Sequence, residues 1–100
     1  RFEPSMSDYT ILFSPRAKQR LEEIAEYLYQ QNLSSTFVVD YLYGFEQWLE
    51  TVLIQFPESG APMSDYGEGV RRVIYRRYSF LYRVNDKRIE VLTVYRENLP

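Results

Sequence analysis

The chain has 100 residues, 45% of them apolar and 17% aromatic, which suits one folded domain with a single core. It contains no cysteine and no histidine, which excludes disulfides, thiolate metal sites and imidazole acid–base catalysis. No apolar run approaches the ~20 residues of a membrane-spanning helix, and no signal-peptide pattern opens the sequence. We therefore expect a cytoplasmic domain over residues 6–100, a tail at residues 1–5, and neither metal nor cofactor.

Charge is divided unevenly along the chain. The net charge is −2, but residues 70–100 carry eight basic side chains against three acidic ones, and residues 1–69 carry four against eleven. The two parts contribute about +5 and −7. We expect function to depend on the basic segment, supported by the fold of the acidic one.

The first elements in chain order are a predicted strand and a predicted helix. Residues 9–13 (YTILF) are β-prone. Ser14 suits a helix N-cap, and Pro15 suits the first helical position, where a missing N–H costs nothing. Apolar residues at helical spacing then continue to about residue 31.

A second, longer helix and a loop follow. After a turn at residues 32–35, in which Ser34 or Ser35 can serve as the cap, the apolar face of this helix runs to Phe56. Gly44 lies inside the helix, and close helix packing would explain it, with a functional hinge as the alternative. Residues 57–69 hold two prolines and three glycines, so we expect a loop without regular structure.

The basic segment predicts three strands joined by tight turns, at residues 70–75, 78–84 and 89–95. The element order is then β-α-α-β-β-β. This order predicts an α+β fold, in which a helical hairpin packs on a small, mainly antiparallel sheet.

The last two strands pair as a hairpin in this prediction. We expect Arg83 to face Glu90, where an ordinary cross-strand ion pair would form. An unbroken register then puts Tyr95 on the same face as Tyr82. Arg96 follows on the opposite face, with Arg83. Both faces are partly apolar, so their pattern does not tell which one packs against the helices.

Five side chains of the strands are the candidate target-binding residues: Arg71, Arg72, Arg83, Tyr95 and Arg96. Basic groups interleaved with aromatic ones on a sheet can bind phosphate or an acidic protein surface. The turn residues Arg76-Arg77 and Lys87-Arg88 are expected to be solvated. No sequence-specific DNA binding is expected, since the first part is acidic and no helix is rich in basic residues.

No residue is assigned a catalytic role. Cutting RNA through its 2′-OH needs a base, and arginine stays protonated while tyrosine is a poor base at neutral pH. Arg72, Arg83 and Arg96 could supply charge for such a reaction. Tyr82 or Tyr95 could stack on a nucleobase.

Short motifs along nearly the whole chain carry a family resemblance. In chain order they are Ser14-Pro15-x-Ala17-x-x-x-Leu21-x-x-Ile24-x-x-Tyr27, Phe56-Pro57-x-x-Gly60, Gly69-Val70-Arg71, Tyr82-Arg83-Val84 and Ile89-x-Val91-Leu92-x-Val94. Over residues 8–96 they resemble the toxins of the RelE/ParE superfamily, and the ParE branch more than the RelE branch. Where the family often has His followed by Arg, this chain has Tyr95-Arg96.

The resemblance implies the toxin of a type II toxin-antitoxin system, neutralised by a ParD-like antitoxin whose C-terminal segment wraps around it. ParE-type toxins act on DNA gyrase, so it implies a gyrase inhibitor that binds its target and is not an enzyme. A ribosome-dependent mRNA interferase of the RelE kind is one alternative. An inactive homologue that survives as an antitoxin-binding scaffold is another.

Overall fold

A computed structural model of the chain describes residues 9–97, so the predicted tail at residues 1–5 lies outside the described part. The elements are β1 (Thr10–Phe13), α1 (Pro15–Gln30), α2 (Ser35–Gln55), β2 (Ala61–Pro62), the 3₁₀ turn η2 (Ser64–Tyr66), β3 (Val70–Tyr75), β4 (Tyr78–Asn85) and β5 (Arg88–Arg96). The predicted α+β order is confirmed. The expectation that the loop after α2 lacks regular structure is wrong, because it contains β2 and η2.

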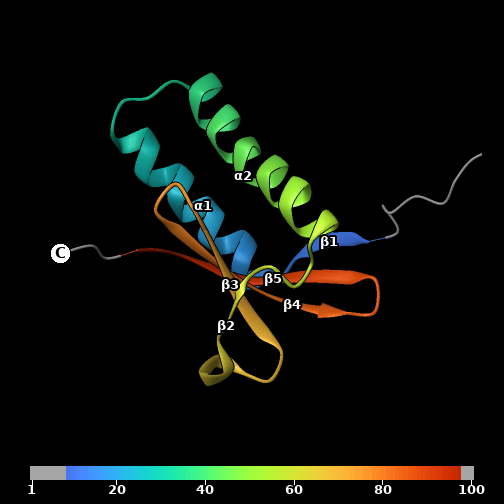
Figure 1. Ribbon diagram of the computed structural model, residues 1–100. Coiled ribbons are helices and arrows are strands. Elements are labelled where there is room, and N and C mark those ends of the chain that lie inside the picture. The colour runs from blue at the N-terminus through green and yellow to red at the C-terminus, as the bar shows by residue number, and fades with distance from the viewer. Residues whose placement is uncertain (1–8, 98–100) are drawn as a thin grey trace, which may run out of the picture.

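The five strands form one mixed sheet in the order β1-β5-β4-β3-β2. β1 runs parallel to β5, and the other neighbours are antiparallel. Both helices lie on one side of this sheet, as an antiparallel hairpin (Figure 1). β5 is therefore an inner strand, between the first strand of the chain and β4.

Serine side chains cap both helices. The Ser14 hydroxyl accepts a hydrogen bond from the Ala17 amide at 3.0 Å and donates to the Leu92 carbonyl at 2.8 Å. The start of α1 is thereby tied to β5. Ser34 caps α2, since its hydroxyl accepts from the Phe37 amide at 3.1 Å, which decides between the two predicted caps.

A β-bulge interrupts the pairing of β4 with β5. Tyr82 faces Val91, but Leu81 faces Thr93, so Leu92 is an extra residue without a partner in β4. The predicted pairing near the hairpin is confirmed. The predicted unbroken register beyond it is wrong, and every later side chain of β5 points to the face opposite the expected one.

The hydrophobic core lies between the helical hairpin and the sheet. Its fully buried side chains include Phe45, Leu49, Leu53, Phe80, Tyr82, Ile89, Val91 and Val94. Trp48, the one tryptophan of the sequence, is only partly buried. Its ring stacks on Tyr75 with the centroids 4.6 Å apart. The bulge is what brings Val94 to the core side, in line with Ile89 and Val91.

Gly44 makes room for an arginine of the β3–β4 turn. The Arg76 guanidinium donates to the Tyr41 carbonyl at 2.8 Å and lies 4.6 Å from the Tyr41 ring centroid and 4.9 Å from that of Tyr75. A Cβ at residue 44 would lie 2.8 Å from Nη2 of Arg76. The prediction that Gly44 serves helix–helix packing is wrong. Arg76 is exposed as predicted, but its guanidinium is held against α2.

Alanine at residue 44 therefore has opposite effects in two backgrounds. In the wild type it gains about 1 kcal/mol of helix propensity but displaces Arg76, which loses a hydrogen bond and ring contacts of about 1–2 kcal/mol. In an Arg76→Ala background only the gain remains. We expect Gly44→Ala to stabilise Arg76→Ala by about 1 kcal/mol and not to stabilise the wild type, as measured by urea unfolding. Equal effects in both backgrounds would contradict this.

Candidate target-binding face

The face of the sheet that points away from the helices is called the open face here. Cross-strand partners share a face, and the register places on this one Val70, Arg72, Ile74, Ser79, Leu81, Arg83, Asn85, Arg88, Glu90, Thr93 and Tyr95. Arg16 and Arg20 of α1 and Tyr66 of η2 border it. Together with Leu81, Thr93 and Tyr95 they line a hollow of about 290 Å³.

Three of the five candidate residues lie on the open face, namely Arg72, Arg83 and Tyr95. The other two do not. Arg71 faces the buried Tyr82 and Arg96 faces the buried Tyr78, so both lie on the helix side. The bulge exchanges the faces of Tyr95 and Arg96, and for Arg71 and Arg72 the sequence pattern does not tell which face packs against the helices.

Arg71 and Tyr82 hold the loop that follows α2. The Tyr82 hydroxyl donates to the Pro57 carbonyl at 2.7 Å and accepts from the Gly60 amide at 2.9 Å. Arg71 donates to the Gly60 carbonyl at 2.8 Å. A Cβ at Gly60 would lie 2.8 Å from the Tyr82 hydroxyl and 2.8 Å from the Arg72 carbonyl oxygen, so the close approach requires glycine.

Tyr82 is consequently not available for stacking. Its side chain is 0% exposed, so the prediction that it could stack on a nucleobase is wrong. Burial raises the pKa of Tyr82 above its ordinary value, and the hydrogen bond from the Gly60 amide opposes this shift. Tyr82 is thus a buried, neutral anchor for the loop.

Arg72 has a partner that the sequence did not suggest. Its Nη1 lies 3.5 Å from Oε2 of Glu97, and the Ser79 hydroxyl donates to the same oxygen. The Glu97 amide donates to the Arg77 carbonyl at 2.7 Å, which fixes the residue beside the β3–β4 turn. The sequence does not indicate this contact, since an unbroken register points Glu97 to the other face.

Arg83 faces Glu90 as predicted, and both residues are exposed. The ion pairs among the described residues join Arg20 to Glu23 and Arg72 to Glu97. No ion pair joins Arg83 to Glu90 in that part of the chain. Arg83 is thus a guanidinium of the open face that no carboxylate engages among the described residues.

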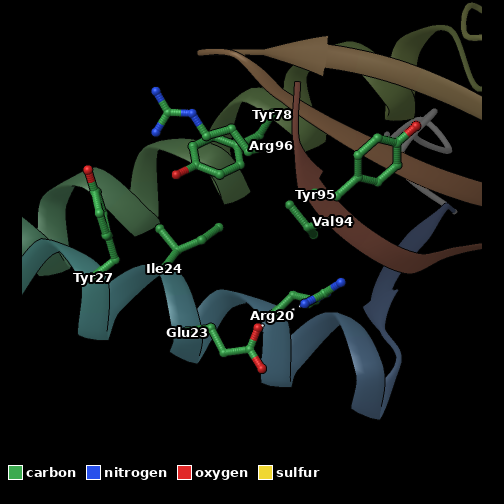
Figure 2. A pocket seen from close by; sticks show the side chains of 8 residues that line it. All are labelled: Arg20, Glu23, Ile24, Tyr27, Tyr78, Val94, Tyr95 and Arg96. Atoms are coloured by element: carbon green, nitrogen blue, oxygen red, sulfur yellow. Dashed lines mark hydrogen bonds and ion pairs between the residues drawn. The ribbon is translucent and has the colours of Figure 1, made fainter. Parts of the chain in front are cut away.

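Arg96 borders a separate cavity of about 310 Å³ between α1 and the strands β4 and β5. Figure 2 shows Ile24 and Tyr27 of α1 pointing toward Tyr78 and Arg96, and Tyr95 pointing away from them. Burial raises the pKa of Tyr78, the nearby Tyr41 adds to this, and Arg96 opposes it. The cavity lies on the helix side and shares only its rim with the open face.

An apolar groove runs between the two helices. It has a volume of about 410 Å³ and is lined by Phe13, Lys18, Leu21, Val39, Leu42, Tyr43, Phe45 and Glu46. Val39 is 60% exposed and Tyr43 is 55% exposed at its mouth. Such an unpartnered apolar strip is the usual docking place of an amphipathic helix.

Two general features of residues 9–97 bear on function. None of the helices there is both long and apolar enough to cross a membrane. No group of three or more His, Cys, Asp or Glu side chains in the same residues could hold a metal ion.

Comparison with known families decides the classification. The family described as "ParE toxin of type II toxin-antitoxin system, parDE" matches residues 11–98. The chain belongs to the ParE toxin family. Among curated proteins, none matches this ParE-family chain.

Solved structures share the fold of this ParE-family toxin at low sequence identity. A chain of the chromosomal ParDE system from P. aeruginosa has a TM-score of 0.71 and 21% identity, covering 94% of this chain and 100% of that one. One of the toxin-antitoxin complex RelBE2 from Mycobacterium tuberculosis has a TM-score of 0.66 and 20% identity, covering 95% and 98%. YafQ from E. coli has a TM-score of 0.54 and 15% identity, covering 88% and 92%.

Removing the Tyr82 hydroxyl should loosen the loop after α2. We expect Tyr82→Phe to lower the free energy of unfolding by about 1–3 kcal/mol, because Gly60 N–H and Pro57 C=O lose a buried partner. Tyr95→Phe on the open face should change it by less than about 0.5 kcal/mol.

The folded protein keeps the Tyr82 proton at pH values where the unfolded chain loses it. Stability should therefore fall as pH rises beyond about 10, and less so in Tyr82→Phe. Parallel pH profiles of the two proteins would contradict this.

Proposed function

We propose that this toxin inhibits DNA gyrase by binding it through the open face, with no bond-breaking chemistry of its own. The observation that carries the proposal is the composition of that face. Arg72, Arg83 and Tyr95 supply positive charge and an aromatic surface, and the chain has no histidine. A guanidinium stays protonated at neutral pH, so these arginines attract an anionic surface but cannot act as a base.

A protein target fits this face better than duplex DNA does. Arginine and tyrosine are the side chains most often found at the energetic centre of protein interfaces. Residues 1–69 carry a charge of about −7, counted from the sequence, and would repel a DNA duplex that approached closely. Gyrase acts on DNA in the cytoplasm, which is where we place the toxin.

The arrangement of the five candidate residues refines the proposed contact. Arg72, Arg83 and Tyr95 form the primary contact surface. Arg71 serves the fold through Gly60, and Arg96 extends the surface only at the rim of the cavity beside α1. These assignments make the first three residues the ones to change first.

A ribosome-dependent mRNA interferase is the second candidate. One observation favours it: the hollow on the open face combines Tyr66 and Tyr95 with Arg16 and Arg20, and aromatic rings with guanidinium groups can hold an unstacked nucleotide. Primer extension on translated message separates the candidates, since only this one produces cuts within codons. The third candidate, an inactive scaffold, predicts normal bacterial growth when the toxin is expressed without an antitoxin.

A ParD-like antitoxin is the proposed neutralising partner. The apolar groove between α1 and α2 would take an amphipathic helix, to which Val39 and Tyr43 are exposed. The fold's resemblance to structures named as ParDE and RelBE2 systems supports this assignment. The groove and the open face lie on opposite sides of the sheet, so neutralisation through the groove alone would not cover Arg72 or Arg83.

Charge reversal on the open face should abolish gyrase inhibition. We expect Arg72→Glu/Arg83→Glu to raise the toxin concentration for half-inhibition of supercoiling by about tenfold or more, because two guanidinium contacts become repulsive. The matched control is Arg77→Glu, an exposed turn residue outside the open face, which should stay within about twofold of the wild type. Circular dichroism confirms folding. Absence of supercoiling inhibition and of a trapped cleavage complex with the wild type would refute the proposal.

A charge in the helical groove should weaken antitoxin binding. We expect Val39→Glu to raise the dissociation constant about tenfold, since it buries a carboxylate against an apolar helix face. Thr51→Glu, an exposed α2 residue that does not line the groove, is the control and should leave affinity unchanged. Calorimetry with the ParD-like antitoxin encoded beside the toxin measures both. Equal affinity of the two variants would place the antitoxin elsewhere.

A further inference from the structure

One anion-binding position on the open face is filled by the chain itself. Glu97 follows β5, and its carboxylate reaches across β4 to β3. There a single oxygen, Oε2, accepts a hydrogen bond from Ser79 and lies 3.5 Å from Nη1 of Arg72. A hydroxyl donor of β4 and a guanidinium of β3 thus converge on one carboxylate oxygen.

Ser79 shows that this position is built into the sheet. It is 0% exposed, and among the residues that the structure describes it is the only polar or charged one that is buried. A buried hydroxyl without a partner is costly, so a side chain at this place needs an acceptor. The acceptor is Glu97, while the Glu97 amide is held separately by the Arg77 carbonyl at 2.7 Å. The backbone can therefore stay in place when the carboxylate swings away.

We propose that Arg72 and Ser79 form a subsite for a carboxylate of the target protein, and that Glu97 occupies it in the free toxin as a latch. The inference rests on the proposed function, because the latched face is the one that contacts the target. The ligand is an aspartate or glutamate side chain, since a guanidinium and one hydroxyl match a carboxylate. A phosphate would leave further oxygens without donors.

The latch is weak enough to be displaced. The Arg72 and Glu97 side chains are 30% and 21% exposed, so water partly screens their attraction. While Glu97 occupies the site, a carboxylate of another protein cannot bind there. The apparent affinity for that carboxylate is therefore its intrinsic affinity multiplied by the fraction of toxin molecules whose site is open. Glu97 thus neutralises Arg72 until a partner with a well-placed acid replaces it, and Arg83 remains available for the first encounter.

The experiment follows the Ser79 amide by NMR during titration with a hexaglutamate peptide, and separately with inorganic phosphate. We expect Glu97→Gln and Glu97→Ala to bind hexaglutamate roughly three- to sixfold more tightly than the wild type. Adding Arg72→Ala should remove the gain. The alanine variant is included because a glutamine at residue 97 could still accept a hydrogen bond from Ser79. Thermal unfolding confirms that each variant is folded.

Glu90→Gln is the matched control. It removes the same charge from the same face, opposite Arg83 and away from Arg72, and should gain clearly less affinity for hexaglutamate than Glu97→Gln does. A gain equal to that of Glu97→Gln would show a general charge effect and overturn the latch, as would no gain in either residue-97 variant. A gain for phosphate without one for hexaglutamate would overturn the carboxylate assignment.

Gyrase assays keep the two proposals apart. If both hold, Glu97→Gln inhibits supercoiling at a several-fold lower concentration than the wild type. Inhibition that is unchanged by Glu97→Gln would overturn the latch and leave gyrase as the target. A gain in hexaglutamate binding without any gyrase inhibition would overturn the target and leave the subsite.

Discussion

The extra residue in β5 determines which side chains the sheet presents. Leu92 has no partner in β4. Its carbonyl accepts a hydrogen bond from the Ser14 hydroxyl. One serine thus caps α1 and satisfies the bulge, so the helix start and the strand irregularity stabilise each other. Beyond the bulge, Val94 enters the core while Tyr95 turns to the open face. A β5 without this insertion would bury a tyrosine and expose a valine.

The motifs by which the chain resembles its family serve the fold more than the target. Tyr82 is hydrogen-bonded to Pro57 and Gly60, and Arg71 is hydrogen-bonded to Gly60. Three of the motifs therefore meet in one hydrogen-bond network. Another motif supplies the Ser14 cap, which contacts the last one at Leu92. Arg83 is the exception, since it belongs to the Tyr82-Arg83-Val84 motif and yet is exposed on the open face, which we propose contacts the target.

The sequence is sufficient for both helices and four of the strands, but it misses β2 and η2 and does not determine the faces. Ser14-Pro15 marks the start of α1 by local hydrogen-bonding and steric rules, and the alternation around Tyr82 fixes its pairing with Val91. The bulge leaves no local signal, because a valine, a leucine and a threonine fit either register. The pairing of Glu97 with Arg72 and the contact of Arg76 with Gly44 also leave no signal in the sequence. Each depends on residues brought together from distant segments.

The strand order also sets when the toxin can acquire its shape. β5 lies between β1 and β4, and the contact from Ser14 to Leu92 spans 78 residues of sequence. During synthesis, a nascent chain that still lacks β5 has no strand with which β1 can pair and against which α1 can pack. Non-local closure of this kind is slow and comes last. The chain can therefore complete this fold only after β5 has left the ribosome.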